Sequence, residues 1–101
     1  MGVNCIDYAI LAVSNTAVGL ASATPAMTGK TQGVIVTVET DQVRWRADGT
    51  APTSTEGHLM NTGDVLSFDS WTSNQNWRSV LTAIRFIRVT TDATLKISYF
   101  D

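Results

Sequence analysis

Two short segments of this 101-residue chain alternate apolar and polar side chains with a period of two residues. The segments are "VIVTVET", Val34–Thr40, and "ATLKISYF", Ala93–Phe100. The apolar side chains that share a face in each segment are Val34, Val36 and Val38, and Leu95, Ile97 and Tyr99. Successive side chains of a strand point to opposite faces of a sheet, so this pattern predicts strands with one buried face.

Further short runs, separated by turn-forming residues, extend the strand pattern over most of the chain. The other expected strands are Cys5–Val13, Thr16–Ser22, Gln42–Ala47, Val65–Ser70 and Thr82–Thr90, with a short one near His58–Met60. No helix-length window shows a period of 3.6 residues. The predicted fold is all-β: a single antiparallel β-sandwich or jelly-roll-like domain over residues 1–101.

Two details of the strand pairing follow from the pattern. Only Thr40-Asp41 separates the strand that begins at Val34 from Gln42–Ala47. This connection is too short for a helix, so we expect the two strands to form a hairpin. Apolar and polar residues lose their alternation within Ala83–Val89, which predicts a β-bulge near Phe86–Ile87.

Charge and composition limit the classes of partner. The chain has 7 Lys and Arg against 9 Asp and Glu, a formal net charge of −2 and a charged fraction of 16%. Nucleic-acid binding normally needs a basic surface, so we expect no nucleic-acid partner. Thr and Ser are abundant, which is typical of β-domains with neutral faces that pack against copies of themselves. Cys5 is the single cysteine, and we expect a buried thiol rather than a disulfide.

The N-terminal apolar segment, Tyr8–Ala26, has the character of neither a membrane span nor a secretion signal. Polar residues at 14–16 interrupt it, well short of the roughly 20 apolar residues that cross a bilayer. Asp7 precedes the segment and no positive charge does, whereas a signal peptide begins with positive charge. We expect no signal peptide and no membrane partner.

Motifs for catalysis and for metal or cofactor binding are incomplete. Gly29-Lys30-Thr31 matches the end of a phosphate-binding loop, but Thr24 stands where that motif needs its first Gly. Zn²⁺ sites draw four ligands largely from Cys and His, and the chain has one of each, Cys5 and His58. His58 is also the sole imidazole base, and no nucleophile motif accompanies it. We expect no enzymatic activity, cofactor or metal, with Ca²⁺ held by carboxylates near turns as an alternative.

Arginine is the strongest remaining candidate for binding. The strand Gln42–Ala47 places Arg44 and Arg46 on one face and Trp45 on the other, which predicts outward arginines and a core tryptophan. After an Asp48-Gly49 turn we expect an ordered loop, reaching His58, that contacts another chain. The candidate interface residues are Arg44, Arg46, Thr53, Glu56, His58, Arg85 and Arg88. The alternative role for the arginines is as solvated cross-strand side chains whose stems cover apolar surface.

Trp71 and Trp77 bracket the polar loop "TSNQN". Aromatic rings beside Asn and Gln can stack on sugar rings, which favours a carbohydrate-binding module. The alternative is that both rings fold back and cap the end of the sandwich.

The second half of the chain resembles small virion structural proteins of tailed bacteriophages, of the head decoration (cement) or tail-associated type. The segments that carry the resemblance are Val43–Arg46, Asp48–Thr50, Pro52–Thr53, Gly63–Asp64, Ala83–Arg88 and Ala93–Tyr99. The resemblance covers about the last 60 residues and, more loosely, the first 40. It implies a non-enzymatic virion component made in the host bacterial cytoplasm.

A cement protein stabilises a phage head by adding contacts between capsomers, and it performs no chemistry of its own. It needs a rigid β-domain with polar, weakly charged faces and often forms closed oligomers. The partners we expect are the chain itself, for example as a trimer, and the major capsid protein or another virion protein. The alternatives are a neck- or tail-associated virion protein and a carbohydrate-binding module of a phage adhesin that uses Trp71 and Trp77.

Overall fold

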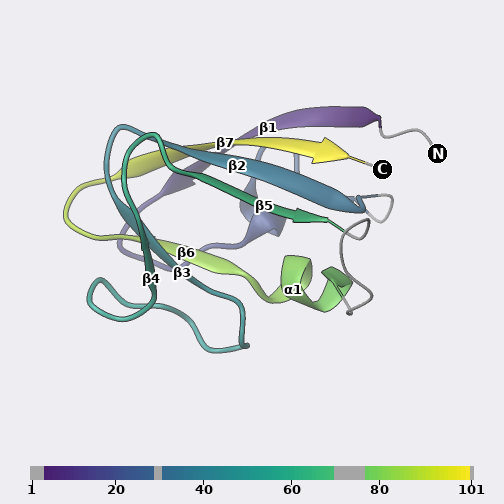
Figure 1. Cartoon of the computed structure of the whole chain (residues 1–101). Coiled ribbons are helices and arrows are strands. Elements are labelled where there is room, and N and C mark those ends of the chain that lie inside the picture. Colours follow the sequence, from purple (N-terminus) through teal and green to yellow (C-terminus); the bar gives the residue numbers. More distant parts are fainter. Residues whose placement is uncertain (1–3, 29–30, 70–76, 101) are drawn as a thin grey trace.

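Two antiparallel sheets pack face to face in the computed structural model, which describes residues 4–28, 31–69 and 77–100 (Figure 1). The four-stranded sheet has the order β1-β7-β2-β5 and the three-stranded sheet the order β4-β3-β6. The strands are β1 (Cys5–Val13), β2 (Gly33–Glu39), β3 (Val43–Arg46), β4 (His58–Met60), β5 (Val65–Asp69), β6 (Arg85–Arg88) and β7 (Ala93–Phe100). The helical elements are the 3-10 helix η1 (Leu20–Ser22) and the helix α1 (Trp77–Ala83). The predicted β-sandwich is confirmed.

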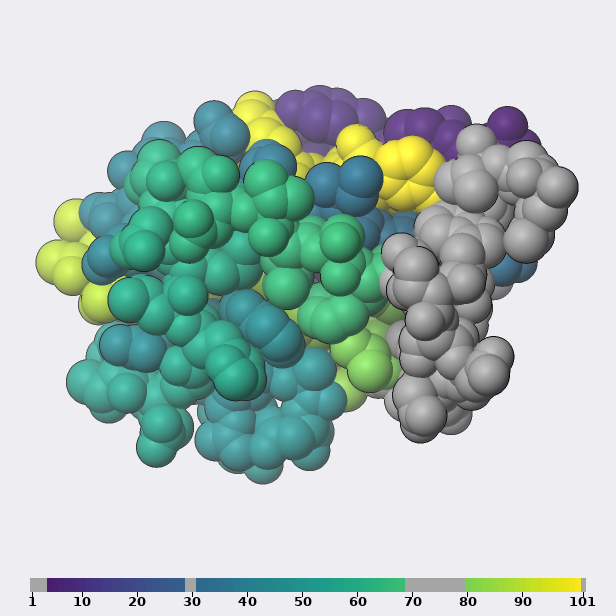
Figure 2. Space-filling view, in the orientation of Figure 1, coloured from purple at the N-terminus to yellow at the C-terminus, as the bar shows by residue number. Residues whose placement is uncertain are grey.

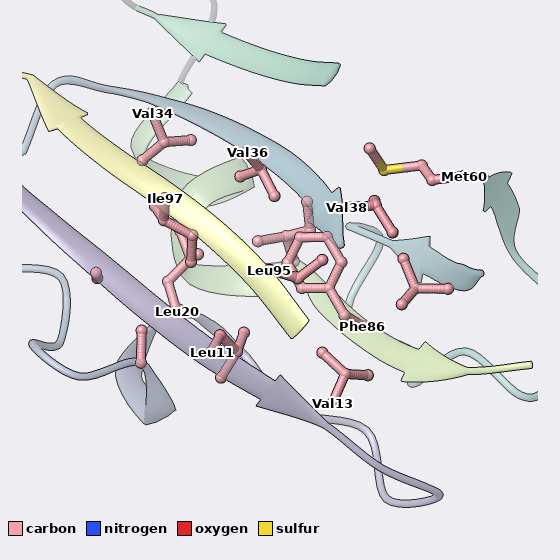
Figure 3. Close-up of a cluster of buried hydrophobic side chains, with 14 of the residues drawn as sticks. Leu11, Val13, Leu20, Val34, Val36, Val38, Met60, Phe86, Leu95 and Ile97 are labelled. Carbon is pink, nitrogen blue, oxygen red and sulfur yellow. The ribbon is translucent and has the colours of Figure 1, made fainter. Parts of the chain in front are cut away.

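The core lies between the sheets and follows the alternation seen in the sequence. Every second residue of β7 is buried, and β2 buries the three valines expected to share a face. The largest fully buried side chains include Tyr99, Phe86, Leu11, Leu95, Ile97, Val36, Val38 and Val43. Figure 3 shows that the labelled side chains, which include Leu11, Val36, Phe86 and Ile97, come from both sheets and meet in one cluster. The hydrophobic effect of this cluster therefore holds the two layers together.

The predicted hairpin between β2 and β3 is wrong. β2 pairs with β5 and β7, whereas β3 pairs with β4 and β6. The short link between them carries the chain from one sheet to the other. Thr40 adopts a φ of 72°, and the Asp41 carboxylate accepts a hydrogen bond from the backbone N–H of Gln42. This sharp corner sets the apolar faces of β2 and β3 opposite each other across the core.

Two strands expected from the sequence are shorter or absent. Within Thr16–Ser22, only Val18 pairs, through a single bridge to Phe86, and Leu20 begins η1. Within Thr82–Thr90, the first two residues belong to α1 and the strand begins at Arg85. A hydrophobic run of this length is compatible with a strand or with a buried turn of helix. In this fold, packing against the rest of the chain selects the helical turn.

The expected β-bulge near Phe86–Ile87 is also wrong. The pairing of β3 with β6 runs without a break, from Val43 opposite Arg88 to Arg46 opposite Arg85. Phe86 and Ile87 are both buried although they point to opposite faces. On the outer face of its sheet, Ile87 lines a hollow together with Thr53 and Ser54 of the segment between β3 and β4. Cys5 is exposed, so the expectation of a buried thiol is wrong as well.

Tyr99 closes one end of the core. It is 1% exposed, and its hydroxyl donates a hydrogen bond to the carbonyl oxygen of Pro25 at 3.1 Å. Burial, together with the nearby charge of Asp7, raises the pKa of Tyr99 to about 12. The unfolded chain would release this proton nearer pH 10, so the contribution of Tyr99 to stability falls as the pH rises from about 10 towards 12.

An absorbance titration of the phenols checks this. We expect a component with a midpoint near pH 12 in the native protein, and its loss in Tyr99→Phe. Superimposable titrations of the two proteins would contradict the assignment.

Candidate functional site

A cleft opens between the two arms of the hairpin that β3 and β4 form. Its volume is about 590 Å³, and it is lined by Trp45, Arg46, Ala47, Asp48, Glu56, Gly57 and His58. We call it the hairpin cleft, and residues 47–57 between the two strands the β3–β4 loop. The hairpin and loop extend away from the four-stranded sheet at the lower left of the molecule (Figures 1 and 2). The cleft therefore belongs to the three-stranded layer of the sandwich.

Trp45 forms the aromatic part of the cleft. Its ring lies 4.6 Å from that of His58, tilted by 37°, because the two residues are partners in the pairing of β3 and β4. It also meets Phe68 of β5 edge-on, with centroids 5.7 Å apart. Trp45 is half-buried and packs against the core from its edge. The prediction that Trp45 belongs to the interior is therefore only partly correct, since the same side chain also lines the cleft.

The cleft beside the Trp45 ring holds more negative than positive side chains. Arg46 donates hydrogen bonds from Nε and Nη2 to the two carboxylate oxygens of Asp48, the first at 3.0 Å. This pairing, with a smaller effect of Glu56, raises the pKa of Arg46, and the same guanidinium lowers the pKa of Asp48. Glu56 makes no hydrogen bond or ion pair through its carboxylate to any described residue. The cleft thus has one carboxylate in excess.

Arg44 holds the β3–β4 loop in place. Its Nε donates to the carbonyl oxygen of Ser54 and its Nη1 to that of Gly57, both at 3.0 Å. Within the loop, the backbones of Thr53 and Glu56 exchange hydrogen bonds of 2.9 and 3.3 Å. Arg44 therefore points outward as predicted, but it is bound by its own loop. The prediction of an ordered loop is consistent with these contacts.

Gly57 brings the loop close to the strand that it leaves. Its φ is +138°, and a Cβ built there would lie 3.1 Å from the carbonyl oxygen of Trp45. We expect Gly57→Ala to lower the free energy of unfolding by about 1–2 kcal/mol, because an alanine resists this backbone conformation and cannot avoid the contact.

Gly49 supplies the matched control, since its φ is +90° but a Cβ there would meet nothing within 4 Å. Gly49→Ala should cost about 1 kcal/mol or less. Urea denaturation of both variants measures the difference. Equal losses of unfolding free energy in the two variants would show that the contact between a Cβ at position 57 and the carbonyl oxygen of Trp45 costs no stability.

The structure gathers most of the candidate interface residues around the hairpin. Arg46 and His58 line the cleft with Glu56, while Thr53 lies on the opposite side of the loop. There, a hollow of about 360 Å³ lies between Thr53 and Arg88. Arg88 forms an ion pair with Asp92.

Arg85 lies farther away from the cleft, although it pairs with Arg46 in the sheet. Its Nη1 donates to the carbonyl oxygens of Thr82 and Ile84 at 2.9 Å each. Of the candidate loop aromatics, Trp71 lies outside the described residues. Trp77 begins α1, and its side chain lies outside them too. The predicted pairing of these two rings on a sugar stays a prediction.

Comparisons with protein-family models, curated proteins and solved structures gave no match to this chain. Its function must therefore be argued from its own surfaces. Among the described residues, no three His, Cys, Asp or Glu side chains gather as ligands for a metal ion. In the same part of the chain, no helix is long and apolar enough to cross a membrane.

The outer face of the four-stranded sheet holds side chains that the sequence analysis did not select. The exposed apolar side chains on this outer face include Tyr8, Ile10, Ile35 and Val65, with exposed fractions of 54%, 43%, 40% and 63%. Ile10 neighbours Lys96 in the pairing of β1 with β7. The sequence signal that could have revealed this surface is Ile35, an isoleucine at an outward position of the alternating segment Val34–Thr40. Large apolar groups gathered on an outer face are typical of interaction surfaces.

Proposed function

We propose that this chain is a non-enzymatic structural protein that binds other protein chains, and that it serves as a capsid decoration (cement) protein of a tailed bacteriophage. The observation that carries the binding role is the projecting β3–β4 loop, which Arg44 fixes through two carbonyl oxygens. A loop fixed in advance loses little conformational entropy on binding. The cleft beside it offers an aromatic ring and a free carboxylate, groups that suit a protein partner.

The assignment to a virion is supported by the resemblance described above. A two-layer sandwich with a low charge agrees with what a cement protein needs, since such a protein adds contacts between capsomers and performs no chemistry. Its partners in this proposal are copies of itself and the major capsid protein. A neck- or tail-associated location is the second candidate within the same virion role, and the two differ in copy number.

Quantitative mass spectrometry of purified virions from the source of this gene tests the proposal. An abundance comparable to that of the major capsid protein would support head decoration. A far lower abundance would place the chain in the neck or tail. Absence from the particle would refute the virion role.

A further inference from the structure

Lys96 differs from the other positively charged residues of the chain. Of the Lys and Arg side chains that the structure describes, it alone has no hydrogen bond or ion pair to the protein. It lies on β7, between β1 and β2, near the centre of the outer face of the four-stranded sheet. The charge thus stands free on a face that also exposes apolar side chains.

The surroundings of Lys96 favour contact with protein. Ile10 on β1 and Thr37 on β2 are its direct neighbours, and Val65 on β5 follows Thr37 in the same row. Glu39 of β2 lies on the same face, opposite Thr94 and diagonal to Lys96. Exposed apolar groups beside so few charges resemble an interface more than a solvated surface. We call this region the Lys96 face: Tyr8, Ile10, Ile35, Thr37, Val65 and Lys96.

The hairpin cleft is complementary to such a side chain. A lysine has a long apolar stem and a compact positive end. The Trp45 ring offers a surface for the stem and attracts the ammonium group. Glu56 offers a carboxylate that makes no hydrogen bond or ion pair to the described residues, since the nearby Arg46 is bound by Asp48 and only its charge acts on Glu56.

The two surfaces cannot meet within one molecule. Lys96 points away from the core on the outer side of the four-stranded sheet, whereas the cleft is built on the other layer, by β3 and β4 (Figure 1). One chain therefore carries both halves of a complementary contact, on opposite layers. Such an arrangement favours a second copy of the chain as the occupant.

We propose that the Lys96 face of one copy docks on the hairpin cleft of a second copy, with the Lys96 stem against Trp45 and its ammonium group bound by Glu56. This inference names the partner at the site described above and rests on the proposed role in protein–protein binding. A contact between two different surfaces repeats from copy to copy, and it forms a ring where the rotation closes. The ion pair selects the partner and the orientation, while the apolar groups around it contribute most of the affinity.

Charge reversal tests the contact. Sedimentation velocity over a range of concentrations should show self-association of the native protein that weakens as the salt concentration rises. Lys96→Glu and Glu56→Lys should each raise the dissociation constant about tenfold or more, because like charges then face each other. The double variant K96E/E56K restores opposite charges and should regain most of the association.

Asp92 provides the control, as an exposed carboxylate in the turn before β7 that pairs with Arg88 and lies outside both the cleft and the Lys96 face. Asp92→Asn should associate as the native protein does. Circular dichroism confirms that each variant is folded, which is expected because all three positions lie at least partly on the surface.

A monomeric native protein throughout the concentration range would overturn the inference. So would single variants that associate normally, or a folded double variant that fails to recover. These outcomes are independent of the virion test. A chain that is abundant in virions yet monomeric in solution keeps its proposed function and loses this contact, and a chain absent from virions can still show the charge-swap recovery.

Discussion

Ile97→Ala is expected to lower the free energy of unfolding by about 2–5 kcal/mol, the usual loss when a buried isoleucine becomes alanine. Ile97 is fully buried in β7, at the centre of the four-stranded sheet, and its side chain fills the space between the layers. Its removal leaves a cavity that the surrounding valines of β2 cannot close without moving their strand. Urea denaturation followed by circular dichroism measures the loss.

Ile35→Ala is the matched control for that variant. Ile35 lies on β2, the strand next to Ile97, but on the outer face, and it is 40% exposed. Its truncation should cost about 1 kcal/mol or less at protein concentrations where the chain is a monomer. Comparable losses for the two variants would contradict the assignment of the inner and outer faces.

Arg44→Gln has the second largest expected effect, about 2–3 kcal/mol. Arg44 is the donor for two carbonyl oxygens of the β3–β4 loop, and the shorter amide cannot reach both. We expect faster backbone hydrogen exchange and faster proteolytic cleavage within residues 47–57, while the core strands keep their protection.

Arg46→Gln separates this effect from the loss of a positive charge as such. Arg46 lies two residues away on the same strand, and its partner Asp48 is exposed. Exposed ion pairs contribute little to stability, so this variant should leave the loop as it is. Loop exchange rates that rise equally in the two variants would show that Arg44 does not hold the loop.

Alternation was a reliable guide where a strand has one face on the core and one in water. β7 occurs with the bounds that its alternation predicted, Ala93–Phe100, and every second residue of it is buried, so its apolar positions follow the pleat. β1 occurs with the bounds of the predicted strand Cys5–Val13, although its outward positions are apolar too. The turn at Asp48-Gly49 was equally predictable, because Gly49 adopts a positive φ of 90°.

The errors have a shared physical origin. A short link can join two paired strands or two strands in different sheets, and the residues around Thr40 do not distinguish these cases by hydrophobicity. The segment that contains Val18 and η1 covers the edges of two sheets, where a few hydrogen bonds replace a regular ladder. Ile87 lies beside Thr53 and Ser54 of the β3–β4 loop, and sequence alone does not specify where that loop lies.

The site was predictable in part. The Arg-Trp-Arg pattern indicated outward arginines, and Arg44 and Arg46 do point away from the core. Their partners were not predictable, because Arg44 binds backbone carbonyls that no side-chain pattern reveals. The free charge of Lys96 could be recognised only after the other described cations had been assigned partners.

The order of the four-stranded sheet has a consequence for the growing polypeptide. β7, the last strand of the chain, lies between β1 and β2, and Cys5 pairs with Phe100. During synthesis, β1 and β2 therefore leave the ribosome before the strand that pairs with both of them. Until β7 is made, their apolar faces are exposed to other molecules. The sheet assembles only when β7 emerges, and pairings so distant along the chain form slowly. Chaperones that bind unpaired strands can bind the chain during this interval.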